Sequence, residues 1–128
     1  MPAPLITIVD DDDSMRASLD NLLRSAGFRA QAFPSAESFL DASPGLDTAC
    51  LILDVRMAGI GGLELQRQLA ASRSRVPIIF VTSHIDDDLR TRALDAGAVA
   101  FLYKPFREDE LLDAIDGVLT KQPEEGGS

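Results

Sequence analysis

Short apolar runs alternate along the chain with segments whose apolar residues recur at helical spacing. Four runs rich in β-branched residues predict buried strands, at residues 5–9, 50–54, 77–82 and 98–103. Residues 28–33 alternate apolar and polar positions, as an edge strand does. Helical periodicity follows each strand, over residues 15–26, a short segment capped by Ser35, residues 62–71, residues 86–96, and a last helix carrying Leu111 to Leu119.

The pattern therefore contains five strand–helix units. Strands that alternate with helices pair in parallel through right-handed crossovers, which place helices on both faces of the sheet. We expect an α/β fold with a doubly wound, five-stranded parallel sheet in the order 2-1-3-4-5 and five helices. Gly27 and Gly97 follow the first and fourth helical segments, where glycine commonly ends a helix.

Length and composition limit the organisation and the class of protein. A chain of 128 residues is long enough for one domain, which we place at residues 1–120, and residues 121–128 have the composition of a disordered tail or linker. Cys50 is the only cysteine, so neither an internal disulfide nor a multi-cysteine zinc site is available. A net charge of -9 argues against direct binding of nucleic acid. The sequence shows neither a membrane-length apolar segment nor a signal peptide, so we expect a cytoplasmic protein with no membrane partner.

Polar residues stand at the ends of the predicted strands. Asp10 and Asp11 follow the first strand, Asp54 ends the third, Thr82 ends the fourth, and Lys104 follows the fifth. The carboxyl ends of parallel strands share one edge of the sheet, and ligands bind there where the strand order reverses. Because the first and third strands are neighbours in the order 2-1-3-4-5, the three carboxylates converge.

Converging carboxylates point to a divalent cation. Two of them 4 Å apart repel by about 4 kcal/mol at an effective dielectric of about 20, and either raised pKa values or a bound cation relieves this repulsion. Oxygen ligands without histidine or cysteine favour a hard ion such as Mg²⁺, with Mn²⁺ as an alternative. Lys104 beside the ion suits an anion that shares it, phosphate above all, and Thr82 adds a hydroxyl. The group describes a phosphoryl site with a carboxylate nucleophile.

The residues at the strand ends also carry a resemblance to a known family. The segments "VDDDDSMR", "LILDVRMAGIGGLEL", "PIIFVTSH" and "ALDAGAVAFLYKPF", followed by an amphipathic helix, resemble the receiver domain of two-component response regulators over roughly residues 5–119. The amino-acid sequence of these segments is most similar to that of receivers that precede a helix-turn-helix DNA-binding domain. The resemblance implies the flavodoxin-like fold and a phosphorylation-controlled switch. It implies no chemistry beyond Mg²⁺-dependent phosphorylation and dephosphorylation of the domain itself.

The resemblance also implies a role for each residue of the metal and phosphoryl site. Asp54 would accept a phosphoryl group from the phosphohistidine of a sensor histidine kinase. Asp11 would bind Mg²⁺ directly, Asp10 would act chiefly through water, and the backbone carbonyl of Arg56 would be a further ligand. Thr82 and Lys104 would contact the phosphoryl oxygens.

Further positions carry regulatory roles by the same resemblance. Phe101 would be the aromatic switch that turns inward on activation, and the Lys104–Pro105 peptide would be cis. Arg56 and His84 occupy the two variable positions that tune hydrolysis of the phosphoryl group. The face formed by the fourth helix, the fifth strand and the fifth helix would then contact a second copy of the chain or a tethered effector domain.

The loop after Asp54 departs from the family pattern. Ala58 replaces a common proline, and Gly61-Gly62 replaces a pair whose first residue is acidic in many relatives. Both changes predict a freer loop.

Other interpretations remain open at this stage. Asp12 and Asp13 favour the positive end of a helix dipole rather than a metal, and Asp10 and Asp11 alone would read as a helix cap. A phosphohydrolase of the haloacid dehalogenase type would use Asp10 as nucleophile and Asp12 as general acid. A pseudo-receiver would be an interaction module without phosphorylation. Asp54 at the buried end of an apolar strand favours the receiver, because a structural role for that carboxylate is hard to find.

Overall fold

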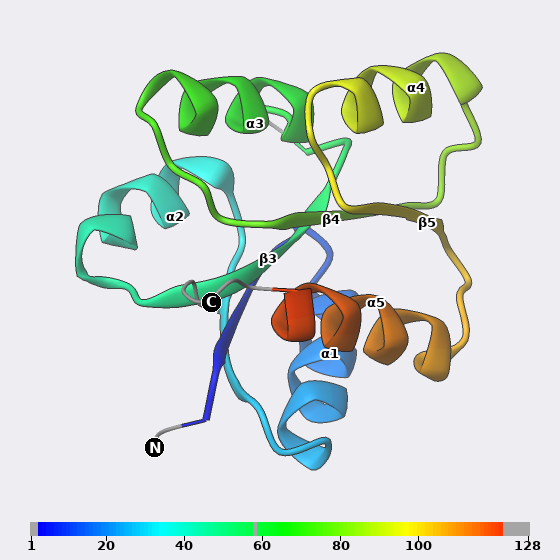
Figure 1. Ribbon diagram of the computed structural model, residues 1–128. Helices are drawn as coiled ribbons and strands as arrows, with labels where there is room; N and C mark the ends of the chain where they lie inside the picture. The colour runs from blue at the N-terminus through cyan, green and yellow to red at the C-terminus, as the bar shows by residue number, and fades with distance from the viewer. Residues whose placement is uncertain (1–2, 58, 122–128) are drawn as a thin grey trace.

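The computed structural model describes residues 3–57 and 59–121 and shows a central parallel sheet between two layers of helices (Figure 1). The strands are β1 (Leu5–Val9), β2 (Arg29–Phe33), β3 (Thr48–Asp54), β4 (Ile78–Thr82) and β5 (Ala100–Tyr103). The helices are α1 (Asp13–Ser25), α2 (Ala36–Ala42), α3 (Gly62–Ala71), α4 (Asp87–Asp95) and α5 (Glu108–Lys121), with a single 3-10 turn, Ser43–Gly45, after α2.

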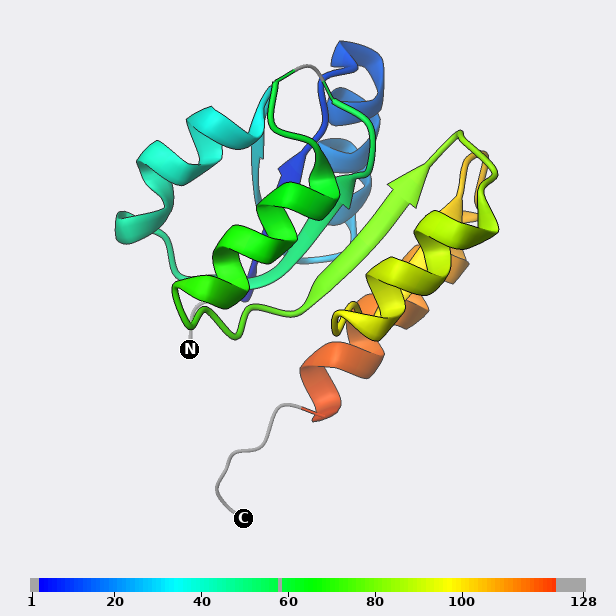
Figure 2. The same ribbon diagram turned by 90° about the horizontal axis from the view of Figure 1, so that it is seen from above.

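The sheet has the predicted topology. Its strands lie in the order β2-β1-β3-β4-β5 and all neighbouring pairs are parallel, so β2 is an edge strand as its pattern indicates. Helices α1 and α5 cover one face, and α2, α3 and α4 cover the other (Figures 1 and 2). The predicted doubly wound α/β fold is confirmed.

β2 and β4 each begin one residue later than predicted, and the starts of β3 and β5 each differ by two residues. β3 begins at Thr48, two residues before the apolar run, where the Thr48 hydroxyl lies 2.8 Å from that of Thr7 on β1. β5 begins only at Ala100, because Ala98 still belongs to the turn that follows α4, where its N–H donates to the carbonyl of Ala93. A contact between two strands accompanies the first of these limits and a local turn the second, and apolar patterning reports neither.

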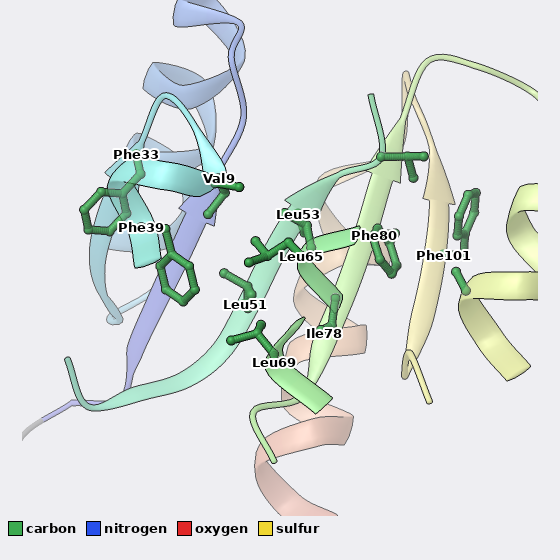
Figure 3. Close-up of a cluster of buried hydrophobic side chains, with 13 residues drawn as sticks. Val9, Phe33, Phe39, Leu51, Leu53, Leu65, Leu69, Ile78, Phe80 and Phe101 are labelled. Carbon is green, nitrogen blue, oxygen red and sulfur yellow. The ribbon is translucent and has the colours of Figure 1, made fainter. Parts of the chain in front are cut away.

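The two faces of the sheet carry different cores. Alternation along β3 sends Leu51 and Leu53 toward α2 and α3, and Cys50 and Ile52 toward α1 and α5. The first core contains the buried phenylalanines (Figure 3). Ring centroids are 5.8 Å apart for Phe33 and Phe39, and 5.9 Å apart for Phe80 and Phe101. The second is mostly aliphatic. Cys50 packs there as a small apolar residue, and burial raises the pKa of its thiol to about 12.

The helix ends follow the predicted signals. Asp12, Ser35 and Asp86 are N-caps whose side chains accept backbone N–H groups of α1, α2 and α4. Gly27 and Gly97, the predicted helix-ending residues, have positive φ angles. Helix α5 continues to Lys121, one residue into the predicted tail, and residues 122–128 lie outside the described part of the chain. None of the described helices has the length and apolarity needed to cross a membrane.

Candidate functional site

The carboxyl ends of β1, β3 and β5 bring together the charged residues singled out from the sequence. Carboxylate oxygens of Asp10, Asp11 and Asp54 all lie within 4.8 Å of one another. The side chain of Lys104, which directly follows β5, contacts two of the three. Residues separated by more than ninety positions along the chain thus form one cluster because the sheet edge gathers the strand ends.

Asp10 is fully buried, and hydrogen bonds engage both of its carboxylate oxygens. Oδ1 accepts the N–H of Asp12 at 2.9 Å, and Oδ2 lies 3.0 Å from Nζ of Lys104. Its backbone N–H donates to the carbonyl of Phe33, which extends the β1–β2 pairing by one residue. A buried carboxylate needs such partners, since an uncompensated one is strongly destabilising.

Asp54 is also buried, with a side chain 10 % exposed, but its surroundings do not satisfy its charge fully. Its Oδ1 accepts the N–H of Arg56 at 3.2 Å, and its Oδ2 lies 3.5 Å from Nζ of Lys104. Burial raises the pKa of Asp54 to about 6, Lys104 lowers it, and the nearby Asp10 carboxylate raises it again. The carboxylate is ionised at neutral pH, yet held in an environment that disfavours its charge, as is typical of reactive groups.

The donor set fits a hard divalent cation. The three carboxylates offer only oxygen, and one of them, on Asp11, belongs to an exposed residue at the mouth of the cluster. A dication would also offset the charge that raises the pKa of Asp54. The aspartate cluster therefore has the chemistry of a magnesium site.

Thr82 and Lys104 end neighbouring strands. The N–H of Lys104 donates to the carbonyl of Thr82 at 2.7 Å, and Thr82 is 1 % exposed. The Thr82 hydroxyl accepts the N–H of His84 at 3.1 Å, so it ties the strand end to the loop leading to α4. The Lys104–Pro105 peptide bond is cis.

The remaining predicted residues lie around the cluster rather than in it. The side chains of Arg56 and His84 belong to exposed residues on the loops after β3 and β4. Phe101 is buried on the α4 side of the sheet beside Phe80 (Figure 3). On its other side, the ring of Tyr103 packs edge-on with its centroid at 5.5 Å.

Asp12 and Asp13 have structural roles at the start of α1. Oδ1 of Asp12 accepts the N–H of Met15 at 3.1 Å as the N-cap, and Asp13 lies in the first turn in an ion pair with Arg16. Both outcomes agree with the helix-dipole interpretation. They also weaken the dehalogenase-type alternative, because its general acid, Asp12, is engaged as a cap.

Sequence reasoning missed Arg16, which contacts the backbone of the acidic cluster. Arg16 donates from one guanidinium nitrogen to the carbonyl of Asp10 at 2.8 Å. The spacing of Asp13 and Arg16, three residues apart on a helix, was the available signal for their pair but not for the backbone contact.

The loop after Asp54 is held more tightly than its glycines predict. A Cβ on Gly62 would lie 2.4 Å from the carbonyl oxygen of Asp54, so this glycine allows close packing rather than freedom. Farther along the loop, Oε2 of Glu37 on α2 accepts the N–H of Ile60 at 3.2 Å. Ala58, where a looser loop was also expected, lies outside the described residues.

Comparisons with known proteins agree with this arrangement. The family described as "Response regulator receiver domain" matches residues 6–116. The chain is 49% identical over 111 residues to Nodulation protein W of Bradyrhizobium diazoefficiens. The aligned segment covers 87% of this chain and 49% of that protein. It is 46% identical over 114 residues to the Transcriptional regulatory protein FixJ of the same organism, covering 89% of this chain and 56% of FixJ.

A solved structure extends the likeness to three dimensions. Full-length FixJ from B. japonicum superposes with a TM-score of 0.90 at 42% sequence identity, over 97% of this chain and 62% of that one. The chain thus spans about half the length of the curated relatives it matches. The family match covers most of the chain and includes all the strand ends described above, and the chain therefore belongs to the response regulator receiver domain family.

Proposed function

We propose that the chain is a phosphorylation-controlled signalling switch that accepts a phosphoryl group on Asp54 from a sensor histidine kinase, with Mg²⁺ as cofactor. The convergence of Asp10, Asp11 and Asp54 with Lys104 at one sheet edge carries the proposal. Three acidic groups and one cation at the carboxyl edge of a parallel sheet suit metal-assisted phosphoryl transfer.

The nucleophile in this proposal is a carboxylate oxygen of Asp54. It attacks the phosphorus of phosphohistidine, the P–N bond breaks, and the imidazole leaves with the electron pair. The N–H of Arg56 orients the carboxylate through Oδ1, and Lys104 faces Oδ2. Bound Mg²⁺ would offset the negative charges of the carboxylates and of the phosphoryl oxygens.

The supporting residues divide by their contacts. Asp11 would be a direct metal ligand, since it lies at the exposed side of the cluster. Asp10 would act chiefly through water, because its two oxygens already have partners. The Arg56 carbonyl would complete the protein ligands, while the Arg56 and His84 side chains would control access of water to the phosphoryl group.

Phosphorylation would be transmitted through Thr82. A hydroxyl drawn toward the phosphoryl oxygens must leave the N–H of His84, which frees the loop before α4. Phe101 is already packed between Phe80 and Tyr103, so the change would rearrange existing contacts on the α4–β5–α5 face. Such a shift between two packings requires only a few kcal/mol.

The switched face would serve a second copy of the chain or a tethered effector domain. The relatives that the chain matches are about twice as long, and FixJ is by name a transcriptional regulatory protein. The output of the longer protein is proposed to be transcriptional, through a helix-turn-helix domain and in the cytoplasm. This chain itself would not contact nucleic acid, given its net charge of -9.

Intact-mass analysis after incubation with acetyl phosphate and Mg²⁺ tests the proposal. We expect wild type to gain the mass of one phosphoryl group, and Asp54→Asn to gain none. Asp13→Asn is the matched control, because it removes a carboxylate from the same region without touching the cluster. An adduct of equal size on Asp54→Asn, or no adduct on wild type, would overturn the assignment.

A further inference from the structure

Arg16 lies behind the acidic cluster and contacts the backbone of its most buried member. One terminal nitrogen of its guanidinium donates to the carbonyl oxygen of Asp10 at 2.8 Å, and the other pairs with the carboxylate of Asp13. The Arg16 side chain is 19% exposed, although it belongs to a helix on the surface of the domain. The planar, forked guanidinium makes both contacts at once, but the one to the Asp10 carbonyl holds it at the cluster, because the pair with the 90% exposed Asp13 is a weak surface ion pair.

The carbonyl that Arg16 holds belongs to the peptide unit joining Asp10 to Asp11. The orientation of this peptide decides where the chain turns out of β1 and in which direction the Asp11 carboxylate points. Asp10 is fully buried, and the Arg16 guanidinium donates to its carbonyl. Removal of the guanidinium would therefore leave this carbonyl without that donor. A buried carbonyl without a partner is costly, and the turn would shift to expose it.

We infer that Arg16 is a positioning residue for the metal site: it fixes the Asp10–Asp11 peptide so that the Asp11 carboxylate faces those of Asp10 and Asp54. The inference rests on the proposed function, since it gives Arg16 a role in the binding of Mg²⁺. Arg16 itself touches neither metal nor phosphoryl group. It acts as groups behind metal ligands commonly do, by holding a ligand in place.

The positive charge of Arg16 alone predicts the opposite effect. A cation near the cluster repels Mg²⁺, so its removal would tighten binding if charge were all that mattered. Positioning predicts weaker binding on removal. The sign of the change therefore separates the two roles.

Helix α1 supplies a matched control. Arg24 makes the same two kinds of contact at the far end of the helix: it pairs with Asp20 at 2.8 Å and donates to the carbonyl of Ala30 at 2.7 Å. It lies two helical turns from Arg16, near the amino end of β2 and away from the carboxyl ends of the strands. Loss of either arginine removes one ion pair and one backbone contact, but only Arg16 adjoins the acidic cluster.

Isothermal titration with Mg²⁺ and thermal unfolding of the wild type, Arg16→Ala, Arg16→Lys and Arg24→Ala test the inference. We expect Arg16→Ala to weaken Mg²⁺ binding about tenfold, Arg16→Lys to recover part of the loss, and Arg24→Ala to bind as the wild type does. The two alanine variants should lower Tm by similar amounts, so that a loss confined to Arg16→Ala does not reflect stability.

Binding by Arg16→Ala as tight as wild type or tighter, or an equal loss in Arg24→Ala, would overturn the inference while leaving phosphorylation of Asp54 intact as a proposal. If wild type bound no Mg²⁺, the metal site and this inference would both fall. A wild type that binds Mg²⁺ but gains no phosphoryl group would overturn the proposed function alone.

Discussion

The ammonium group of Lys104 lies 3.0 Å from Oδ2 of Asp10, closer than the 3.5 Å that separates it from Oδ2 of Asp54. This cation is thus shared unequally between the two buried carboxylates. Each carboxylate also accepts one backbone N–H, at 2.9 Å from Asp12 for Asp10 and at 3.2 Å from Arg56 for Asp54, so both contacts of Asp54 are the longer ones. The proposed nucleophile is the carboxylate that its neighbours stabilise less.

Removal of the lysine charge should move the pKa of Asp54 upward. Lys104→Gln takes away the interaction that lowers this pKa, so it should rise above its value of about 6. The same change removes a competing cation, and Mg²⁺ should bind several-fold more tightly. A carboxyl-carbon NMR titration and isothermal titration measure the two effects, with Lys104→Arg as the charge-retaining control. A fall in the pKa would contradict the geometry.

Metal-free protein should become more stable as the pH falls from 7 toward 5. The folded-state pKa of Asp54, about 6, lies above its ordinary value of 3.8, so between these values the folded protein binds more protons than the unfolded chain. Asp54→Asn should abolish this part of the pH dependence and stabilise the protein at pH 7 by roughly 1–3 kcal/mol. Urea unfolding in EDTA at several pH values measures both, and parallel curves for the two proteins would refute the prediction.

Asp11 and Asp13 should differ in their importance for the metal. Asp11→Asn removes a carboxylate of the cluster and should weaken Mg²⁺ binding at least tenfold, whereas Asp13→Asn, a change to a side chain 90% exposed, should leave it within about twofold. Isothermal titration with Mg²⁺ compares them directly. Equal losses would show that general negative charge, rather than ligation, attracts the ion.

Gly62→Ala should destabilise the fold next to the site. The new Cβ would lie 2.4 Å from the carbonyl oxygen of Asp54 and 3.0 Å from the Phe80 ring, so strand end and helix start would have to separate, at a cost of about 1–3 kcal/mol. Gly61→Ala is the matched control, because its nearest neighbour would be at 3.4 Å. Urea unfolding measures both variants. If the two cost the same, close packing is not the reason for the glycine at position 62.

The sequence predicts the residues of the acidic cluster better than it predicts the residues that hold them in place. Apolar runs that end in aspartate place Asp10, Asp11 and Asp54 at one sheet edge, because parallel topology leaves no other arrangement for them. The contact between Arg16 and the Asp10 carbonyl has no such signature, since a backbone carbonyl carries no residue identity. The role of Gly62 was misread for a related reason. A glycine that is required because a side chain would not fit looks identical in sequence to a glycine that makes a loop freer.

The limits of β3 and β5 likewise separate what the sequence predicts from what only the folded structure defines. Patterning located both strands, but a hydroxyl pair and the end of α4 moved their first residues by two positions each. The raised pKa of Asp54 likewise depends on burial and on distances to Asp10 and Lys104, which only the folded chain defines.

The edge-on packing of Tyr103 against Phe101 has a practical consequence. The chain has no tryptophan and a single tyrosine, so its near-ultraviolet absorbance and its intrinsic fluorescence come chiefly from one phenol, located beside the proposed aromatic switch and directly before Lys104. The phenol is partly buried, and its hydroxyl oxygen is buried without a hydrogen-bond partner among the described residues. Its emission is therefore a native, label-free optical signal from one position, and rearrangement of the α4–β5–α5 face can be followed in real time in the unmodified protein.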